Sequence, residues 1–248
     1  MSLVNKKKII SDVIRYSIYL LVILFFVWAA QQGYFNKIVN EPDTFFNLLR
    51  QHLELVAVSS LFAIVVAIPA GILVTRPRFR KLEWLVSNIA NLGQTIPSLA
   101  VLALLLGVLG IGFKTAVFAL FIYSVLPIFR NTVAGIDSIN DQLIDAAKGM
   151  GFKPYQVLLR IELPNAAYAI FAGIRTAIVL NIGTAALAYL IGGGGFGNWI
   201  FTGINLFDNG TLMSGAVPVT LLAVSVDLLL RGLEYVVVPK GARRTLET

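Results

Sequence analysis

Cysteine is missing from the 248-residue sequence, histidine occurs once, and charged residues make up only 13% of the chain. The lack of cysteine excludes disulfides, thiolate metal sites and cysteine nucleophiles. His52 has no second histidine with which to share a metal, and nothing beside it indicates a Ser/His/Asp arrangement. A soluble domain usually carries about a quarter charged residues, so the scarcity of charge, together with 57% hydrophobic residues, indicates a membrane protein.

Long stretches without charge make up much of the chain. A helix needs about 20 apolar residues to cross a hydrocarbon core of about 30 Å, and four stretches reach that length: residues 16–36, 55–75, 84–113 and 176–207. Two shorter stretches, 115–129 and 209–226, are interpreted as spans because flanking polar residues can snorkel and Asp227 can face the protein interior. The sequence therefore predicts an all-α integral membrane protein with about six transmembrane helices.

The formal net charge of +7 follows a membrane topology rather than a nucleic-acid surface. Sixteen of the 20 lysines and arginines fall on one side of the predicted spans, in residues 6–15, 76–81, 130–160 and 231–244. Only Lys37, Arg50 and Lys114 fall on the other side. Cytoplasmic segments are enriched in Lys and Arg, so we expect both termini to be cytoplasmic and no nucleic acid as a partner. Topological retention explains the cations of residues 76–81, and an anionic lipid site is the alternative.

The first apolar stretch follows three lysines, so a secretory signal peptide has to be considered. The uncharged run is longer than the 7 to 15 residues typical of a signal peptide. Val27-Trp28-Ala29 also makes a poor cleavage site. We therefore expect an uncleaved anchor.

A polar segment, residues 131–164, lies between two apolar regions and predicts two short cytoplasmic helices. Ser138 or Asn140 can cap the first helix, and Gly151 suits the left-handed position just after its end. Pro154 suits the first turn of the second helix. Pro164 is then expected to restart the chain into the membrane.

The first of these helices contains Ala146 and Ala147, whose short side chains would let another protein approach the backbone closely. Two glycines follow, and a docking surface would explain them. An ordinary amphipathic interfacial helix is the alternative.

The sequence Asp145-Ala146-Ala147, followed by Gly151 and then Ile161-x-Leu163-Pro164, resembles the EAA motif of type I ABC importer permeases. Asp145 replaces the usual Glu, which keeps the carboxylate but shortens its reach. In that family the motif forms the helix that sits in a groove of the ATP-hydrolysing subunit. The resemblance implies the type I ABC importer transmembrane fold, and it assigns ATPase coupling to Asp145, Ala146, Ala147, Gly149, Gly151, Ile161, Leu163 and Pro164.

The resemblance also divides the chain. Residues 1–46 would form an N-terminal transmembrane helix and an external segment, residues 47–230 the type-1 transmembrane domain, and residues 231–248 a cytoplasmic tail. The location implied is the cytoplasmic (inner) membrane of a prokaryote.

Partners follow from what the chain lacks. It has no Walker motif, so ATP and Mg²⁺ would be used by separate cytoplasmic ATPase subunits, and this chain would be a transport subunit that binds no cofactor. Solute capture would need an extracytoplasmic solute-binding protein. One chain supplies half a pathway, so a second permease, identical or related, is expected, and membrane lipid surrounds the pair.

Three segments narrow the resemblance to a substrate class. Residues 94–98, 126–132 and 173–177 are similar to permeases for osmoprotectants such as glycine betaine, choline and carnitine. Permeases for methionine share parts of these segments, so an importer of methionine or another amino acid is the alternative. A passive channel would leave the motif unexplained, and a membrane-embedded enzyme would need more ionisable groups than Arg175 and Asp227.

Pro97 and Pro127 lie inside predicted spans, and each frees a backbone carbonyl. Broken helices that line a cavity present such polar groups within a membrane, and the candidate translocation path comprises Gln94, Thr95, Pro97, Ser98, Tyr123, Asn181 and Thr184. Hydrogen bonding between helices is the alternative. Tyr123, Tyr189 and Trp199 would offer aromatic faces to a quaternary ammonium solute, or else belong to interfacial aromatic belts.

The glycine-rich stretch 192–197 lacks the Lys and Ser/Thr of a phosphate-binding loop and predicts a flexible or re-entrant external turn. Arg175 is expected to snorkel or to pair inside the bundle, with a role in gating as the alternative.

Overall fold

In the computed structural model of the protein, residues 17, 20, 21 and 24–238 are described. Every regular element in this part of the chain is a helix, which confirms the all-α prediction. The predicted anchor, 16–36, and the predicted tail, 231–248, each lie partly outside the described residues. The named helices are α2 (Asn36–Asn40), α3 (Pro42–Val74), α4 (Leu82–Thr95), α5 (Ser98–Leu109), α6 (Phe113–Asp137), α7 (Asp141–Gly149), α8 (Pro154–Val157), the π-helical η1 (Leu158–Glu162), α9 (Leu163–Thr184), the 3-10 helical η2 (Ala185–Ile191), α10 (Gly197–Leu206) and α11 (Asn209–Val237).

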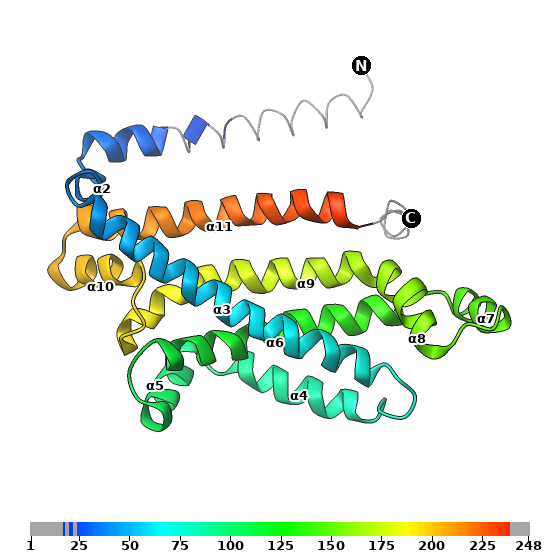
Figure 1. Ribbon diagram of the computed structural model, residues 1–248. Coiled ribbons are helices and arrows are strands. Elements are labelled where there is room, and N and C mark those ends of the chain that lie inside the picture. The colour runs from blue at the N-terminus through cyan, green and yellow to red at the C-terminus, as the bar shows by residue number, and fades with distance from the viewer. Residues whose placement is uncertain (1–16, 18–19, 22–23, 239–248) are drawn as a thin grey trace, which may run out of the picture.

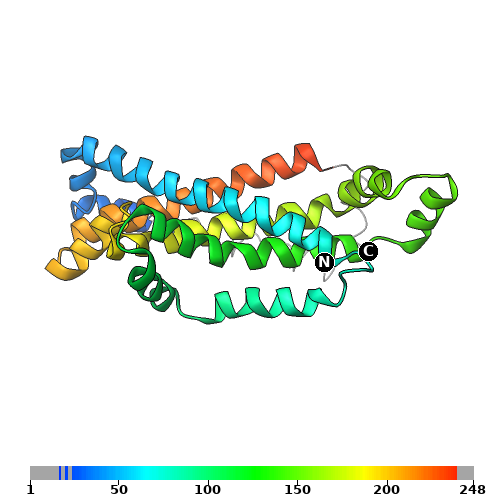
Figure 2. The same cartoon turned by 60° about the horizontal axis from the view of Figure 1, so that its bottom comes forward.

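Four helical segments are long and apolar enough to cross a membrane. They are α3, α6, the continuous stretch Pro154–Ile191 and most of α11. These segments run along the length of the molecule (Figure 1 and Figure 2), where α6 packs against both α3 and α9, and α11 packs against α9. The structure therefore has the multi-pass helical architecture that the sequence predicted.

A stripe of small residues lets α3 approach its neighbours closely. Ser59, Ala63, Ala67 and Gly71 recur every fourth residue on one face, and all four are buried. A β-carbon at Gly71 would lie only 2.8 Å from Thr132 of α6. Small residues serve this purpose where helices pack inside a membrane, so α3 and α6 form the close centre of the bundle.

The predicted span 84–113 is wrong as a single helix, because the chain breaks at Pro97. Ile96 is extended, with ψ 129°, as the residue before a proline prefers. The helix α4 ends there, and α5 starts in a different direction (Figure 1). The two pieces have 14 and 12 residues, so neither reaches the length of a straight membrane span.

The predicted start of the 55–75 span is also wrong as a helix boundary, since α3 begins at Pro42 and continues to Val74. Leu48 and His52 are buried, whereas Arg50 and Glu54 form an exposed pair on the other side of the helix. The polar residues therefore lie on the outer face of one continuous helix.

The predicted span 176–207 also has boundaries that differ from those of the helix. The helical stretch runs from Pro154 to Ile191, and the chain turns at the glycines before the short helix α10. Arg175 directly precedes the uncharged run 176–207 but does not mark the start of the helix. Its charge is paired, because its Nη1 lies 2.8 Å from Glu234 Oε2 and its Nε lies 3.5 Å from Asp227 Oδ1. The expected pairing of Arg175 inside the bundle is confirmed.

The two ends of the molecule differ. The helices α7 and α8 and the connection between α3 and α4 lie at one end, whereas α2, α10 and the glycine-rich turn lie at the other (Figure 1). The turn packs against α3, where the Gly195 N–H donates to Gln51 Oε1 at 2.9 Å. Gly195 has φ +80°, and a β-carbon there would lie 3.0 Å from His52 Nδ1. The predicted turn is present and is closely packed.

Candidate functional site

The helix α7 is delimited by two local signals. Asn140 accepts a hydrogen bond from the Gln142 N–H at 2.9 Å and so caps its start. At its end, the Phe152 N–H donates to Ala147 O at 3.1 Å and the Gly151 N–H donates to Lys148 O at 2.9 Å. This pair of bonds is a Schellman motif, and Gly151 occupies its left-handed position with φ +83°. The predicted cap and the predicted glycine position are both confirmed.

The two alanines of the motif differ in exposure. Ala147 is 1% exposed and packs inward, whereas Ala146 faces outward together with Leu143 and Met150, which are 50% and 69% exposed. Asp145 is also exposed and lies 3.3 Å from Lys148 Nζ. The outer face of α7 thus combines short, apolar and acidic side chains.

Gly149 lies on the exposed side of α7, and a β-carbon there would meet no atom of this chain within 4 Å. A glycine inside a helix costs about 1 kcal/mol relative to alanine. Packing within the chain therefore does not explain its small size, whereas a second protein lying close to the backbone would.

The second half of the motif continues into the membrane without a break. The helix begins at Pro154, passes through the π-helical residues of η1 and continues as α9. Pro164 lies in the first turn of α9, as predicted, but α9 follows η1 without a gap. Proline within a helix clashes with the carbonyl four residues earlier, and the wider π turn directly before Pro164 accommodates it. Ile161, Leu163 and Pro164 are half-buried, and Leu163 packs against the Ile136, Ala166 and Ile170 cluster.

Glu162, the variable position of the motif, was not predicted as a site residue. It is 5% exposed and forms a double hydrogen bond with Arg76, in which Nη1 lies 3.0 Å from Oε1 and Nη2 donates to Oε2. The Arg76 Nε also donates to Ile72 O at 3.1 Å. Neither topological retention nor an anionic lipid site, the two interpretations of the cations of residues 76–81, predicts this pair. The signal available in the sequence is a glutamate amid the apolar motif residues.

A second arginine of the same connection is paired at the surface. Arg80 donates to both carboxylate oxygens of Asp137, at 2.7 and 2.8 Å, and this contact raises the pKa of Arg80. Half of the Arg80 side chain is exposed. The α3–α4 connection is thus joined to η1 by an ion pair whose carboxylate is buried and to α6 by an exposed ion pair.

A cavity of about 590 Å³ lies behind α7. Among its lining residues are Arg76, Ile136, Asp141, Ile144, Asp145, Phe152 and Glu162. Within the described part of the chain, no group of three His, Cys, Asp or Glu side chains is placed to hold a metal ion.

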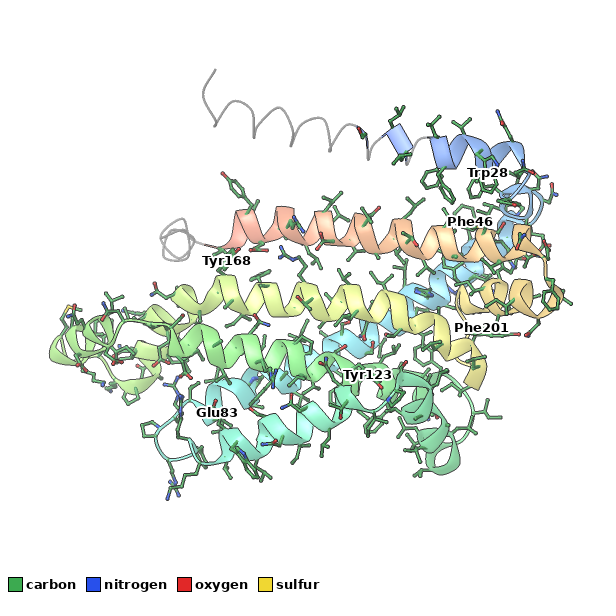
Figure 3. All side chains as sticks on the ribbon, turned by 180° about the vertical axis from the view of Figure 1, so that it is seen from behind. Trp28, Phe46, Glu83, Tyr123, Tyr168 and Phe201 are labelled. Carbon is green, nitrogen blue, oxygen red and sulfur yellow. The ribbon has the colours of Figure 1, made fainter. Side chains whose placement is uncertain are left out.

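The candidate path residues gather around the break at Pro97. Gln94 Nε2 donates to Tyr123 O at 2.9 Å, and the Tyr123 hydroxyl donates to Ile96 O. Figure 3 shows Tyr123 on α6 where it faces the α4–α5 junction. Thr95 bonds to Leu92 O on the exposed side. Gln94 and Tyr123 therefore join α4 to α6, as expected from the alternative interpretation, hydrogen bonding between helices.

Ser98, Tyr123 and Thr184 line one small cleft between α5, α6 and the end of α9. Asn181 lies elsewhere, buried against α3, where its Nδ2 donates to Ser59 Oγ at 3.0 Å and to Ser60 Oγ at 3.1 Å. Of the seven candidates, the structure therefore brings Ser98, Tyr123 and Thr184 together in one cleft and places Asn181 apart from them.

The three aromatic candidates have separate neighbours. Tyr189 stacks on Phe201, with 6.1 Å between ring centroids. Trp199 is buried beside Phe196, and Lys37 Nζ lies 5.9 Å from its ring centroid. Tyr123 is therefore the aromatic candidate that borders the cleft.

The profile of the family described as binding-protein-dependent transport system inner membrane component matches residues 67–241. The choline transport system permease protein OpuBB of Bacillus subtilis (strain 168) is 43% identical over 79% of this chain and 90% of its own length. The osmoprotectant import permease protein OsmY of Salmonella typhimurium (strain LT2) is 44% identical over 85% of this chain and 88% of its own. An inward-facing structure of the MetNI methionine ABC transporter superposes with a TM-score of 0.71 at 23% identity, covering 78% of this chain and 96% of that one.

Proposed function

Because the chain belongs to the family of binding-protein-dependent transport system inner membrane components, we propose that it imports an osmoprotectant such as glycine betaine, choline or carnitine. The chain is a permease subunit of an ABC importer and not an enzyme. The observation that carries the choice of solute is the 43% and 44% identity to permeases named for choline and for osmoprotectants. The likeness to the methionine transporter, at 23% identity, supports the fold alone.

The chemistry of the proposed path agrees with such a solute. Its cleft is lined by Ser98, Tyr123 and Thr184 among apolar residues, and no charged side chain lines it. A strongly charged solute would need a compensating charge in the membrane, where an unpaired ion is costly. A zwitterion of zero net charge or an aromatic-stabilised quaternary ammonium group does not.

The surface proposed to receive the ATPase subunit is the outer face of α7. It is formed by Leu143, Asp145, Ala146, Gly149 and Met150, which we call the docking face. ATP and Mg²⁺ would be used by that partner and not by this chain. Closure of two ATPase subunits would displace α7 as a rigid body, and the displacement would switch the path between outward and inward access.

The proposed orientation places the α7 end in the cytoplasm with both termini, and the α2 and α10 end outside. A solute-binding protein would meet the outer end. A second permease, identical or related, would complete the pathway. This orientation puts the cation-rich segments inside, as the bias of membrane proteins requires.

Uptake measurements in proteoliposomes test the proposal. The permease, its ATPase and its solute-binding protein would be reconstituted, and radiolabelled glycine betaine, choline, carnitine and methionine would be offered. We expect ATP-dependent uptake of at least one of the first three, and none when the binding protein is omitted. Uptake of methionine alone would indicate an amino-acid importer, and uptake without ATP would indicate a channel.

A further inference from the structure

We propose that Arg76 and Glu162 form a permanent clamp that makes the cytoplasmic end of α3 move together with the coupling segment, which we define as residues 141–164. The inference rests on the proposed docking of α7 onto an ATPase subunit. It assigns a positioning role to two residues outside the motif positions that the sequence marked.

The geometry is that of a strong pair. The guanidinium and the carboxylate meet through two hydrogen bonds, one of them 3.0 Å long, and Glu162 is 5% exposed. Paired planar groups of this kind are stronger and more directional than a single contact. Glu162 is the buried partner, since its side chain is 7% exposed against 32% for Arg76. Loss of Arg76 would leave this buried carboxylate without compensation, so the pair resists opening.

Both residues of the clamp are held in place by their own elements. Arg76 lies two residues after the end of α3, and its Nε–H is occupied by the Ile72 carbonyl. Glu162 ends the π-helical segment. The first three buried positions along its helix are Val157, Glu162 and Ala166, so the first spacing is five residues and the second is four. The π turn supplies the five-residue spacing that brings Glu162 onto the inward face.

The clamp lies between the docking face and the membrane. Arg76 and Glu162 both line the cavity behind α7, and α3 continues from Arg76 through the centre of the bundle. Within the bundle, Ser59 and Ser60 of α3 accept hydrogen bonds from Asn181 of α9. A displacement of the coupling segment would therefore reach α3 directly through the ion pair, as well as α9 through the backbone.

The exposed Arg80–Asp137 pair offers a matched control. Arg80 lies in the same α3–α4 connection as Arg76, and its guanidinium likewise donates two hydrogen bonds to one carboxylate. The side chains of Arg80 and Asp137 are 49% and 34% exposed, and exposed ion pairs contribute little. Arg80→Gln should therefore leave coupling unchanged if burial of the pair is what matters.

The first experiment measures ATP hydrolysis and solute uptake in the reconstituted complex of permease, ATPase and solute-binding protein. For Glu162→Gln and Arg76→Gln we expect uptake to fall at least about tenfold, while ATP hydrolysis falls less than about threefold. Arg76→Lys and Glu162→Asp should give intermediate ratios of solute moved per ATP. Equal loss of hydrolysis and uptake, or uptake equal to that of the unmodified chain, would overturn the clamp.

The second experiment uses the absence of cysteine from the chain. A double variant, Arg76→Cys with Glu162→Cys, should transport poorly, and a short bis-methanethiosulfonate reagent that joins the two thiols should restore uptake severalfold. If joining them instead stopped residual uptake, the pair would have to open during the cycle and the clamp would be refuted. A complex that shows no ATP-dependent uptake even without substitutions would contradict the proposed function and not the clamp.

Discussion

Gln94 supplies the hydrogen bond that Pro127 removes from Tyr123. The Tyr123 carbonyl would bond to the N–H four residues later in a regular helix, and that residue is Pro127, which has none. Gln94 Nε2 lies 2.9 Å from this carbonyl oxygen. A side chain of α4 thus completes the backbone of α6 next to the break at Pro97.

Replacement of Gln94 by leucine should lower the free energy of unfolding in detergent by about 1–3 kcal/mol, because a part-buried carbonyl loses its donor. Denaturant titration measures the change. Adding Pro127→Ala should recover part of it, since alanine restores an N–H to α6. Asn88→Ala is the control, because Asn88 bonds its own exposed helix at Trp84 O, and it should cost less than about 0.5 kcal/mol. Purely additive losses at positions 94 and 127 would contradict this account.

Replacement of Gly149 by leucine should separate docking from folding. The new side chain meets no atom of this chain within 4 Å of its β-carbon, and leucine favours the helix over glycine by up to about 1 kcal/mol. Thermal stability of the isolated permease should therefore stay equal or rise. Co-purification of the ATPase should fall because the docking face is obstructed. Undiminished co-purification would exclude Gly149 from the contact.

Gly151→Asp should act by strain as well as by charge. The residue has φ +83° and open space around it, so the cost arises from the left-handed backbone, about 1–3 kcal/mol locally. Membrane insertion should survive, while uptake and ATPase co-purification fall. Gly151→Asn is the control, because asparagine tolerates this conformation better. Normal uptake by the aspartate variant would count against a docking role for this turn.

Orientation can be tested with single cysteines in this cysteine-free chain. Met150 directly follows α7 and Leu206 ends α10, two helices at opposite ends of the molecule (Figure 1), and both residues are 69% exposed. A membrane-impermeant thiol reagent applied to intact cells should label Leu206→Cys and not Met150→Cys, and inverted vesicles should show the reverse. A tag after Thr248 should likewise be reached only from the cytoplasm. Labelling of Met150→Cys from outside would invert the proposed topology.

The stability that Asp208 gives to the start of α11 should be lost at acid pH. Its carboxylate accepts hydrogen bonds from Thr211 and Gly210, and the Thr211 side chain is the first cause that lowers the pKa of Asp208. Because folding lowers the pKa of Asp208, its carboxylate contributes fully to stability above the usual carboxyl pKa of about 4. This contribution is lost as the pH falls through the pKa of the folded state. Asp208→Ala should lower stability at neutral pH, typically by about 1 kcal/mol for a lost cap.

The difference in unfolding free energy between Asp208→Ala and the unmodified chain should be constant from pH 7 to about pH 5 and should shrink below about pH 4. Denaturant titrations at several pH values measure it. A difference that does not change with pH would show that the charge of Asp208 plays no part in the cap.

The sequence by itself determined the features that depend on neighbouring residues. Low charge and long apolar stretches predict a helical membrane protein, because the hydrocarbon core admits few other structures. Asn140 and Gly151 mark the limits of α7, since capping and a left-handed turn involve bonds across only a few residues. The spacing from Asp145 to Pro164 is likewise a local pattern, and from it the sequence predicts the proposed coupling segment.

Tertiary structure alone decided which side chains meet. Arg76 and Glu162 are 86 residues apart in the chain, and only the packing of α3 beside α9 brings the two charges together. The same packing buries Ala147 and leaves Ala146 exposed. It also pairs Arg175 with Glu234, so that α9 includes residues before the uncharged run 176–207. Charge interrupts a hydropathy pattern whether or not it is neutralised in space, and for that reason the boundaries of α3 and α9 could not be predicted from the sequence.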